Sequence, residues 1–385
     1  MSPDEEILPA GAPARLTIDL TAIQDNVARL KELAGAASVM AVVKGDAYGH
    51  GLLPSAKAAV RGGASWLGVA QLAEAIALRE AGIETPVISW LHAPGLDFDA
   101  AVERRIDVGV PAIWELHAVA AAARRVGRSA RVHLKVDTGL ARNGAYGADW
   151  TDLVAAAGPL VAEGVLDVVG VFTHFACADE PEHPSVQAQQ DKFADAVEDV
   201  ERAGFDIEVR HMSNSAATLT RPSAAWDMVR PGLAVYGLSP VPQVGDPVSF
   251  GLRPAMTASA NITVVKRIPA GQGVSYGYTY VPERETTVVN VPIGYADGVP
   301  RSASNVGPVQ VAAARRTITG RVCMDQFVVD VGDDEVHAGD PVVLFGPGTG
   351  GEPTAQDWAE ATDTISYEIV TRMSTRLSRI YVGNN

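Results

Sequence analysis

Short apolar runs alternate with amphipathic stretches over the first 250 residues of the chain. Eight runs rich in valine, isoleucine and leucine have the length of buried strands: 39–43, 66–69, 87–90, 107–110, 131–136, 168–172, 207–210 and 227–229. Between them, apolar residues recur at helical spacing near 21–33, 52–61, 70–81, 113–125, 150–162, 185–203 and 216–220. Eight buried strands with intervening helices are typical of a (β/α)8 barrel, an α/β fold. A doubly wound open sheet remains the alternative, because strand counting does not separate the two.

The pattern changes after Gly237, where a proline-rich connector follows at 238–242. Strand-like runs then succeed one another without helices between them, at 259–267, 286–293, 309–312, 317–331 and 341–345. One late helix is expected from about residue 354. The sequence therefore predicts a barrel domain over 14–250 and a C-terminal, mostly antiparallel β domain over 251–385, with residues 1–13 packing against the latter.

Composition narrows the class of protein. A chain of 385 residues with 47% hydrophobic and 20% charged residues is globular and long enough for two domains. Its net charge of −15 (31 − 46) disfavours nucleic acid as a partner. Two cysteines, an acidic N-terminus and the lack of a long apolar run predict a cytoplasmic protein without a membrane anchor. The eight histidines lack metal-ligand spacing, so no metal is expected.

Lysines are rare, and two of the six lie at the C-terminal ends of predicted barrel strands, the face that carries the chemistry in this fold. Lys44 follows the run 39–43, and Lys135 lies near the end of the run 131–136. A lysine that emerges from an apolar strand is partly desolvated. Desolvation lowers its pKa and favours the neutral, nucleophilic amine.

The segment AVVKGDAYGHG at residues 41–51 resembles the cofactor-lysine signature of the alanine racemases, a family of fold type III that depends on pyridoxal 5′-phosphate (PLP). The resemblance runs over roughly residues 14–380. It implies an isomerase that interconverts L- and D-alanine and supplies D-alanine for peptidoglycan. It also implies that Lys44 holds PLP covalently, with Tyr48 near the cofactor phosphate.

Further barrel positions match the family. The resemblance implies that Arg142 steers the cofactor and the substrate carboxylate and that His174 lies in the active site. Lys135 matches a lysine that many members of the family carbamylate, and the sequence does not decide whether Lys135 itself is carbamylated. Ala141 stands where many members have glycine. Arg230 is implied to face the pyridine nitrogen, where a permanent cation disfavours protonation of that nitrogen and weakens the electron sink.

Loops after the last two strands of a barrel commonly bind phosphate. Ser215 follows the seventh predicted strand, and Gly232 and the N–H of Leu233 follow the eighth. We expect these three residues to hold the cofactor phosphate, and the resemblance adds Tyr367 on the phosphate side.

Racemisation requires a proton to leave one face of Cα and to return on the other, so two bases are expected. Lys44 is one. The segment GVSYGYT at 273–279 resembles the family's second-base segment and makes Tyr276 the other. In the family this tyrosine enters the site of the partner subunit, which implies a homodimer, and Met324 lies in a segment that lines the substrate entrance.

Three other functions fit parts of the pattern. They are a broader amino-acid racemase that also accepts serine, a fold-related PLP-dependent decarboxylase, and a non-catalytic PLP-binding module. Arg230 argues against decarboxylation, and the presence of both Lys44 and Tyr276 argues against the non-catalytic module. Alanine and serine differ by a single hydroxyl, and a tight pocket discriminates only weakly on that basis. The sequence therefore does not decide which of the two is the substrate.

Overall fold

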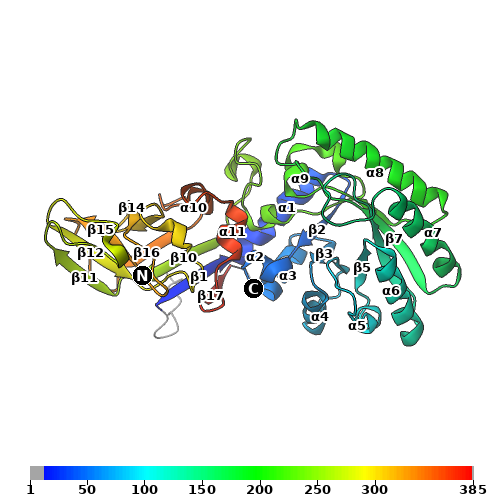
Figure 1. The fold of residues 1–385 in the computed structure, drawn as a ribbon, viewed down its shortest axis with the longest axis horizontal. Helices are drawn as coiled ribbons and strands as arrows, with labels where there is room; N and C mark the ends of the chain where they lie inside the picture. The colour runs from blue at the N-terminus through cyan, green and yellow to red at the C-terminus, as the bar shows by residue number, and fades with distance from the viewer. Residues whose placement is uncertain (1–12, 384–385) are drawn as a thin grey trace. The chain divides into compact units, whose positions relative to one another are not determined.

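The structure, a computed structural model, describes residues 13–383, and their contacts divide them into two units (Figure 1). One unit comprises residues 22–47 and 52–253. The other comprises residues 13–21, 48–51 and 254–383. Residues 1–12, which we expected to pack against the C-terminal domain, lie outside the described part of the chain.

The first unit is a nearly closed barrel of eight parallel strands in the order β8-β7-β6-β5-β4-β3-β2-β9. The strands are β2 Ser38–Val42, β3 Trp66–Val69, β4 Val87–Ser89, β5 Asp107–Val110, β6 Ala130–Lys135, β7 Leu166–Phe172, β8 Val209–His211 and β9 Met228–Val229. Next to β8 and β9, the N–H of Arg230 donates to the carbonyl of Ser213 at 2.8 Å, which helps close the ring. The predicted barrel is confirmed, and the open-sheet alternative is wrong.

Helices alternate with these strands because apolar residues at helical spacing give each helix one face to bury against them. They are α1 Leu20–Ala34, α3 Leu52–Arg61, α4 Leu72–Glu80, α5 Asp99–Glu103, α6 Ile113–Val126, α7 Ala148–Ala162, α8 Pro184–Arg202 and α9 Ser215–Thr220. The barrel core includes Met40, Trp66 and Ile88, with Trp90 packed against them. Gly68 leaves room for the Trp90 ring, whose atoms lie 2.7 Å from where a Cβ would stand.

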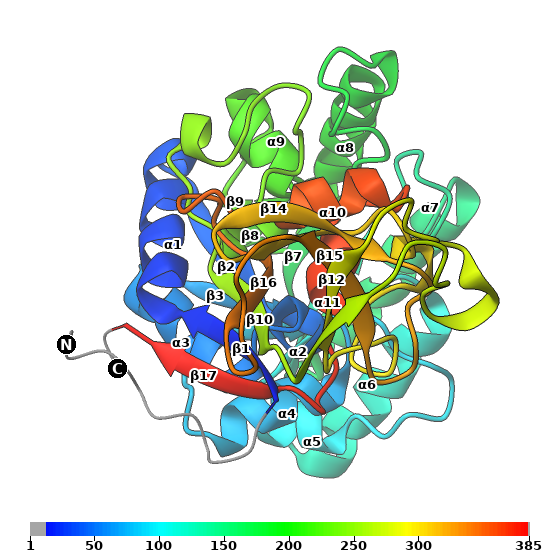
Figure 2. The same cartoon turned by 90° about the vertical axis from the view of Figure 1, so that its left-hand side faces the viewer.

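The second unit is built on a nine-stranded, mostly antiparallel sheet in the order β11-β12-β15-β14-β13-β16-β10-β1-β17. The strands are β1 Ala14–Asp19, β10 Met256–Asn261, β11 Val264–Ile268, β12 Thr286–Val291, β13 Pro308–Val311, β14 Ala314–Thr319, β15 Phe327–Gly332, β16 Pro341–Phe345 and β17 Ser378–Val382. Figure 2 shows β1 and β17 side by side, and they pair in parallel. The segment Ala14–Asp19, which the sequence analysis placed in the barrel domain, thus belongs to this sheet.

Three expected elements are split in the structure. The run 259–267 spans two strands, β10 and β11, and the run 317–331 spans β14 and β15. Gly320, with φ of +79°, turns the chain out of β14. The late helix is two helices, α10 Ala355–Ala361 and α11 Ser366–Thr371, because Asp363 has φ of +56° and cannot continue a right-handed helix.

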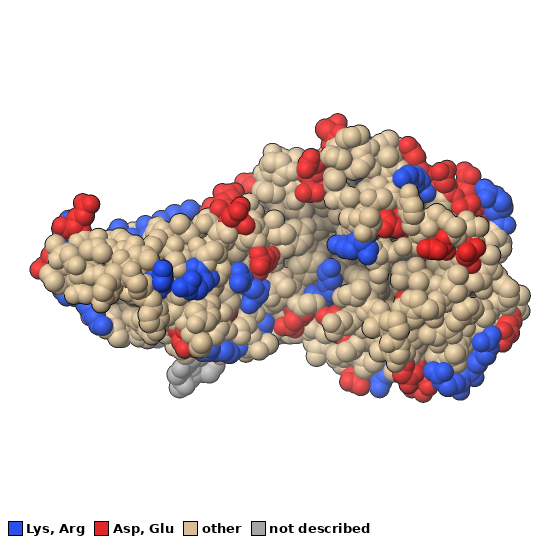
Figure 3. Space-filling view, in the orientation of Figure 1, with Lys and Arg blue, Asp and Glu red and all other residues tan. Residues whose placement is uncertain are grey.

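Charged side chains of both signs are interspersed on the face drawn in Figure 3. Many charged side chains of the described residues form ion pairs, as Arg124 does with Glu163 at 2.6 Å. None of the described helices is both long and apolar enough to cross a membrane.

Candidate active site

Lys44 lies two residues beyond the end of β2, and the chain then turns in a left-handed helical conformation. Gly45, Asp46 and Ala47 have φ of 63°, 53° and 55°, and the N–H of Ala47 donates to the carbonyl of Val43 at 2.9 Å. Each residue other than glycine costs roughly 1–2 kcal/mol in this conformation. The sequence does not predict this turn, because alanine rarely adopts these angles.

Two carboxylates stabilise this strained turn. Glu74 accepts a hydrogen bond from the N–H of Gly45 at 2.6 Å, and Asp46 accepts one from the N–H of Leu52 at 2.8 Å. Strain of this kind persists only where the surroundings hold it, and it is concentrated at functional sites. The turn therefore fixes the direction in which the chain leaves Lys44.

The electrostatic environment favours the neutral form of both barrel lysines. Burial lowers the pKa of Lys44, and the nearby guanidinium of Arg142 lowers it further. At the end of β6, burial and then the charge of Arg230 lower the pKa of Lys135 to about 8. The Nζ atom of Lys135 lies 5.3 Å from the centre of the Phe172 ring. Both amines therefore have a larger neutral fraction at neutral pH than an ordinary lysine.

Arg142 lies in the loop that follows β6, and hydrogen bonds to Asp137 stabilise this loop. One carboxylate oxygen of Asp137 accepts from the N–H groups of Gly139, Leu140 and Ala141 at 2.8, 2.9 and 3.2 Å. Ala141 has φ of +55°, which explains why many members of the resembled family have glycine at this position. The side chain of Arg142 is exposed, and among the described residues its guanidinium makes no hydrogen bond.

Arg230 is a buried cation, with only 6% of its surface exposed. Burial lowers its pKa to about 9, so the guanidinium stays charged at neutral pH. It donates to the carbonyl of Thr173 at 2.6 Å and to Nδ1 of His174 at 3.4 Å. Burial and the charge of Arg230 hold the pKa of His174 well below its usual value, so this imidazole is neutral and presents an Nε2–H.

The structure brings Ser215 and Gly232 together. Ser215 Oγ accepts from the N–H groups of Gly232 and Ala234 at 2.8 and 3.2 Å. Ser215 begins α9, and Leu233 begins the 3-10 helix Leu233–Tyr236. The N–H groups of these two residues have no acceptor within the described part of the chain, as expected at helix N-termini. Two backbone donors are thus available beside the Ser215 hydroxyl.

In the second unit, Tyr48 and Tyr367 lie close together, with ring centres 6.2 Å apart and planes tilted by 43°. Burial raises the pKa of Tyr48 well above its ordinary value, so the phenol stays protonated. The next turn packs tightly in the same unit: a Cβ on Gly49 would stand 2.4 Å from the carbonyl oxygen of Val370. The two tyrosines predicted on the phosphate side are therefore neighbours.

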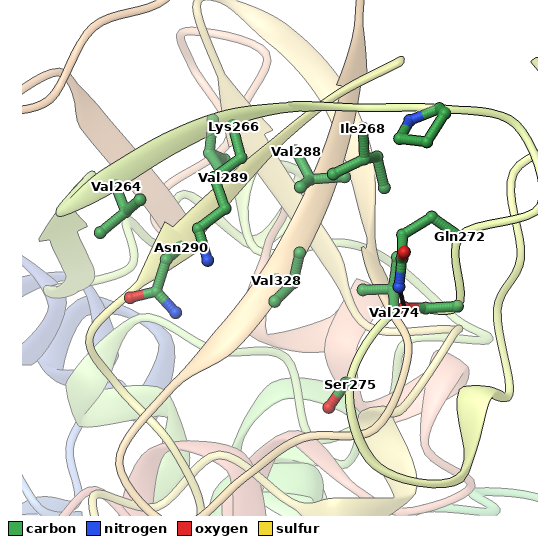
Figure 4. A pocket seen from close by; sticks show the side chains of 12 residues that line it. Val264, Lys266, Ile268, Gln272, Val274, Ser275, Val288, Val289, Asn290 and Val328 are labelled. Carbon is green, nitrogen blue, oxygen red and sulfur yellow. Dashed lines mark hydrogen bonds between the residues drawn. The ribbon is translucent and has the colours of Figure 1, made fainter. Parts of the chain in front are cut away.

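Tyr276 and Met324 are both exposed, by 70% and 53%. Tyr276 follows Ser275, which has φ of +59° and whose hydroxyl donates to the carbonyl of Arg321 at 2.7 Å. Ser275 also lines a cavity of about 360 Å³ (Figure 4). The cavity lies between β11, β12 and the loop that joins these two strands. In this figure the side chains of Val264, Val288 and Val328 stand along the cavity, whose wall is largely apolar.

Sequence reasoning missed two buried polar clusters in the barrel. In the first, His92 bonds to Ser89 Oγ at 2.9 Å and to Glu115, and burial raises the pKa of Glu115. In the second, Asp107, His133 and His211 lie inside the barrel. Three of these six polar residues fall within apolar runs, which is the only signal that could have identified them: Ser89, Asp107 and His133. His211 directly follows such a run.

Together, the barrel, two lysines with lowered pKa values and a buried arginine are typical of an enzyme that carries its reactive groups at the carboxyl ends of the strands. Residues 18–240 match the family model of the alanine racemase N-terminal domain, and residues 255–381 match that of the alanine racemase C-terminal domain. The chain belongs to the alanine racemase family and is an isomerase.

Individual alanine racemases are similar to this chain over nearly its whole length. The alanine racemase of Frankia casuarinae is 57% identical over 376 residues, which cover 97% of this chain and 98% of that protein. The alanine racemase of Thermobifida fusca is 56% identical, covering 96% and 98%. The crystal structure of alanine racemase from D-cycloserine-producing Streptomyces lavendulae has a TM-score of 0.96 and 53% identity, covering 97% and 98%.

Proposed function

We propose that this chain interconverts L- and D-alanine in the cytoplasm with PLP bound at Lys44, and that it supplies D-alanine for peptidoglycan. The observation that carries the proposal is a lysine with a lowered pKa at the end of β2, with the unpaired guanidinium of Arg142 nearby. A related structure, the Bacillus anthracis alanine racemase, was solved with bound L-Ala-P and is 35% identical with a TM-score of 0.89.

The residues present fit the cofactor. A neutral Lys44 amine can bind the aldehyde, and the N–H groups of Ser215 and Leu233 can donate to the phosphate. Nε–H of Arg230 has no acceptor among the described residues and can donate to a pyridine nitrogen. When bound there, PLP supplies a sink for the electron pair that remains when Cα loses its proton. Because Arg230 stays charged at neutral pH, it keeps that sink weak and disfavours decarboxylation.

Arg142 is the expected partner of the substrate carboxylate, since a guanidinium binds a carboxylate in a bidentate manner. Lys135 is the expected site of carbamylation, because only a neutral amine adds to carbon dioxide and its pKa of about 8 leaves a substantial neutral fraction. A carbamate at Lys135 would turn a cation into an anion that holds Arg142 in place.

Two bases on opposite faces of Cα complete the proposal. Lys44, freed when the substrate takes its place, moves the proton on one face. Tyr276 of the partner subunit moves it on the other, in keeping with its 70% exposure in the single chain. The neutral His174, with an Nε2–H to donate, is suited to stabilise the phenolate of that tyrosine. The active enzyme is accordingly a homodimer.

Proton transfer in D2O tests the assignment. Tyr276→Phe should lose deuterium incorporation from one alanine enantiomer and Lys44→Ala from the other, each by roughly 10²–10⁴-fold. Ser55→Ala, a buried change in α3, is the control and should behave as wild type. Normal racemisation by Tyr276→Phe would refute the two-base scheme. Rates on a panel of L-amino acids decide between alanine and serine.

A further inference from the structure

A row of hydrogen bonds crosses the barrel interior and ends on Arg230. Arg230 bonds to Nδ1 of His211 at 3.1 Å, and Nε2 of His211 bonds to Nδ1 of His133 at 2.9 Å. Nε2 of His133 then bonds to Asp107 Oδ2 at 3.2 Å. All four residues are buried, with exposed fractions of 6%, 0%, 0% and 2%. The row links the end of β9 to β8, β6 and β5.

The direction of every bond in the row is determined by its two ends. A guanidinium can only donate, so Nδ1 of His211 accepts and its hydrogen is on Nε2. That hydrogen is donated to Nδ1 of His133, whose own hydrogen is therefore on Nε2 and is donated to the Asp107 carboxylate. Both imidazoles are neutral Nε2–H tautomers in this arrangement. Burial and the charge of Arg230 also hold the pKa of His211 well below its usual value.

The surrounding side chains shape this space for the imidazoles. A Cβ on Gly170 would stand 2.1 Å from Nδ1 of His133, so only glycine on β7 leaves room for that ring. His211 stacks on Phe172 with ring centres 4.9 Å apart and planes 4° apart. The edge of His133 meets Trp66 at 5.5 Å. These contacts leave the two rings little freedom to turn.

The far end of the row is anchored by ion pairs. Asp107 Oδ1 accepts from Nε of Arg131 at 3.0 Å, and Arg131 also pairs with Glu208 at 2.8 Å. Oδ2 of Asp107, which accepts from His133, also accepts from Nη2 of Arg131 at 3.4 Å. A buried negative charge thus stands at one end of the row and a buried positive charge at the other.

We propose that Asp107, His133 and His211 form a positioning relay that orients the Arg230 guanidinium and offsets its charge from across the barrel. The relay rests on the proposed function in one respect, which is that Arg230 contacts the pyridine nitrogen of PLP. If His211 carried its hydrogen on Nδ1, that N–H would face an N–H of Arg230 and turn the guanidinium away. The carboxylate of Asp107 prevents this state, because it accepts only when the hydrogen of His133 is on Nε2.

The tautomers can be measured directly on the cofactor-free protein. Long-range ¹H–¹⁵N spectra of the protein labelled with ¹⁵N-histidine report which ring nitrogen carries the hydrogen, and His133→Gln and His211→Gln assign the two signals. The relay predicts the Nε2–H tautomer for both residues. An Nδ1–H tautomer, or a charged ring, at either position near pH 7 would overturn it. This measurement needs neither activity nor PLP.

Substitution of the carboxylate tests the consequence for the enzyme. Asp107→Leu keeps the branched shape and removes both acceptors, whereas Asp107→Asn keeps one oxygen that can still accept from His133. We expect Asp107→Leu to lower kcat roughly ten- to a hundredfold at nearly unchanged KM for alanine, because Arg230 meets the cofactor and not the substrate. The absorption band of the bound cofactor should change with it, and Asp107→Asn should restore most of both properties.

Glu208→Gln is the matched control, because it weakens the other ion pair of Arg131 without touching the relay. Equal losses in Asp107→Leu and Glu208→Gln, or a rise in KM equal to the fall in kcat, would show a merely structural role and overturn the relay. If both histidines of wild type are Nε2–H tautomers and Asp107→Leu populates the Nδ1–H tautomer of His133, but no PLP binds to wild type, the proposed function fails and the relay stands. If Asp107→Leu instead binds PLP and racemises alanine normally, with unaltered tautomers and kcat, the relay fails and the proposed function stands.

Discussion

Replacement of Ser215 by alanine should destabilise the barrel unit of the cofactor-free protein. Ser215 Oγ is the acceptor for the N–H groups of Gly232 and Ala234, and all three residues are buried. A buried donor left without an acceptor costs roughly 1–3 kcal/mol. With two donors and some local relaxation, we expect a loss of about 2–4 kcal/mol in the free energy of unfolding.

Ser55 in α3 provides a matched comparison. It is fully buried like Ser215, but its hydroxyl has no hydrogen-bond partner within the described residues. Ser55→Ala removes a desolvated hydroxyl and adds helix propensity, so it should stabilise the protein by about 0.5–1 kcal/mol. The same atom is deleted in both variants, and the predicted effects have opposite signs.

Urea unfolding followed by tryptophan fluorescence measures both variants. Five of the six tryptophans lie in the barrel unit, so the signal reports mainly on that unit. The reasoning is refuted if Ser215→Ala unfolds within about 0.5 kcal/mol of wild type, or if the two variants shift stability equally. Wild-type affinity of Ser215→Ala for PLP would separately contradict the predicted phosphate site.

Three further predictions concern the site. Mixing Lys44→Ala with Tyr276→Phe subunits should restore about a quarter of wild-type activity, since half of the dimers are mixed and each has one intact site; no recovery would place both bases in one chain. With a pKa of about 8, Lys135 has roughly 300-fold more neutral amine at pH 7 than a free lysine, and this fraction falls as the pH drops. ¹³C-bicarbonate should therefore give a carbamate signal that fades below about pH 7 and is absent in Lys135→Gln; a signal that persists in that variant contradicts the assignment. Ala141→Gly should raise the unfolding free energy by about 0.5–1 kcal/mol, because relief of the strain at φ of +55° exceeds the entropy that glycine adds to the unfolded chain. A loss of stability in this variant would show that Ala141 is not strained.

The barrel could be predicted because strands buried on both faces appear as short apolar runs. All eight runs of the barrel correspond to strands, and the seven predicted helices fall within a few residues of their expected ranges. The short helix α5, Asp99–Glu103, was not predicted. The sheet of the second unit was harder. β17 is partly exposed along its whole length, and β1 lies 236 residues or more from both of its neighbours in the sheet, so local pattern does not reveal their pairing.

The site could be predicted from the sequence less completely than the barrel. Position at a strand end singled out Lys44 and Lys135, and both have lowered pKa values in the structure. Their roles stay predictions. The roles of Arg142, Arg230 and Tyr276 came from family resemblance, since an arginine or tyrosine in a loop has many ordinary uses. The left-handed turn after Lys44 could not be predicted, because distant carboxylates hold it against the local preference of Ala47.

The buried histidines illustrate a further limit. A single polar residue in an apolar strand is usually a satisfied core residue, and only the three-dimensional row from Asp107 to Arg230 gives His133 and His211 a common direction. Asp107 and Arg230, at the two ends of the row, are 123 positions apart, so no short window of the sequence contains both.

Reduction of the PLP-loaded protein with borohydride, followed by peptide mapping, tests the central claim most directly. The account predicts one pyridoxyl-modified lysine, in the peptide that contains Lys44, and no labelling of Lys135 or of the Lys44→Ala variant. Modification at another lysine, or none at all, would contradict it.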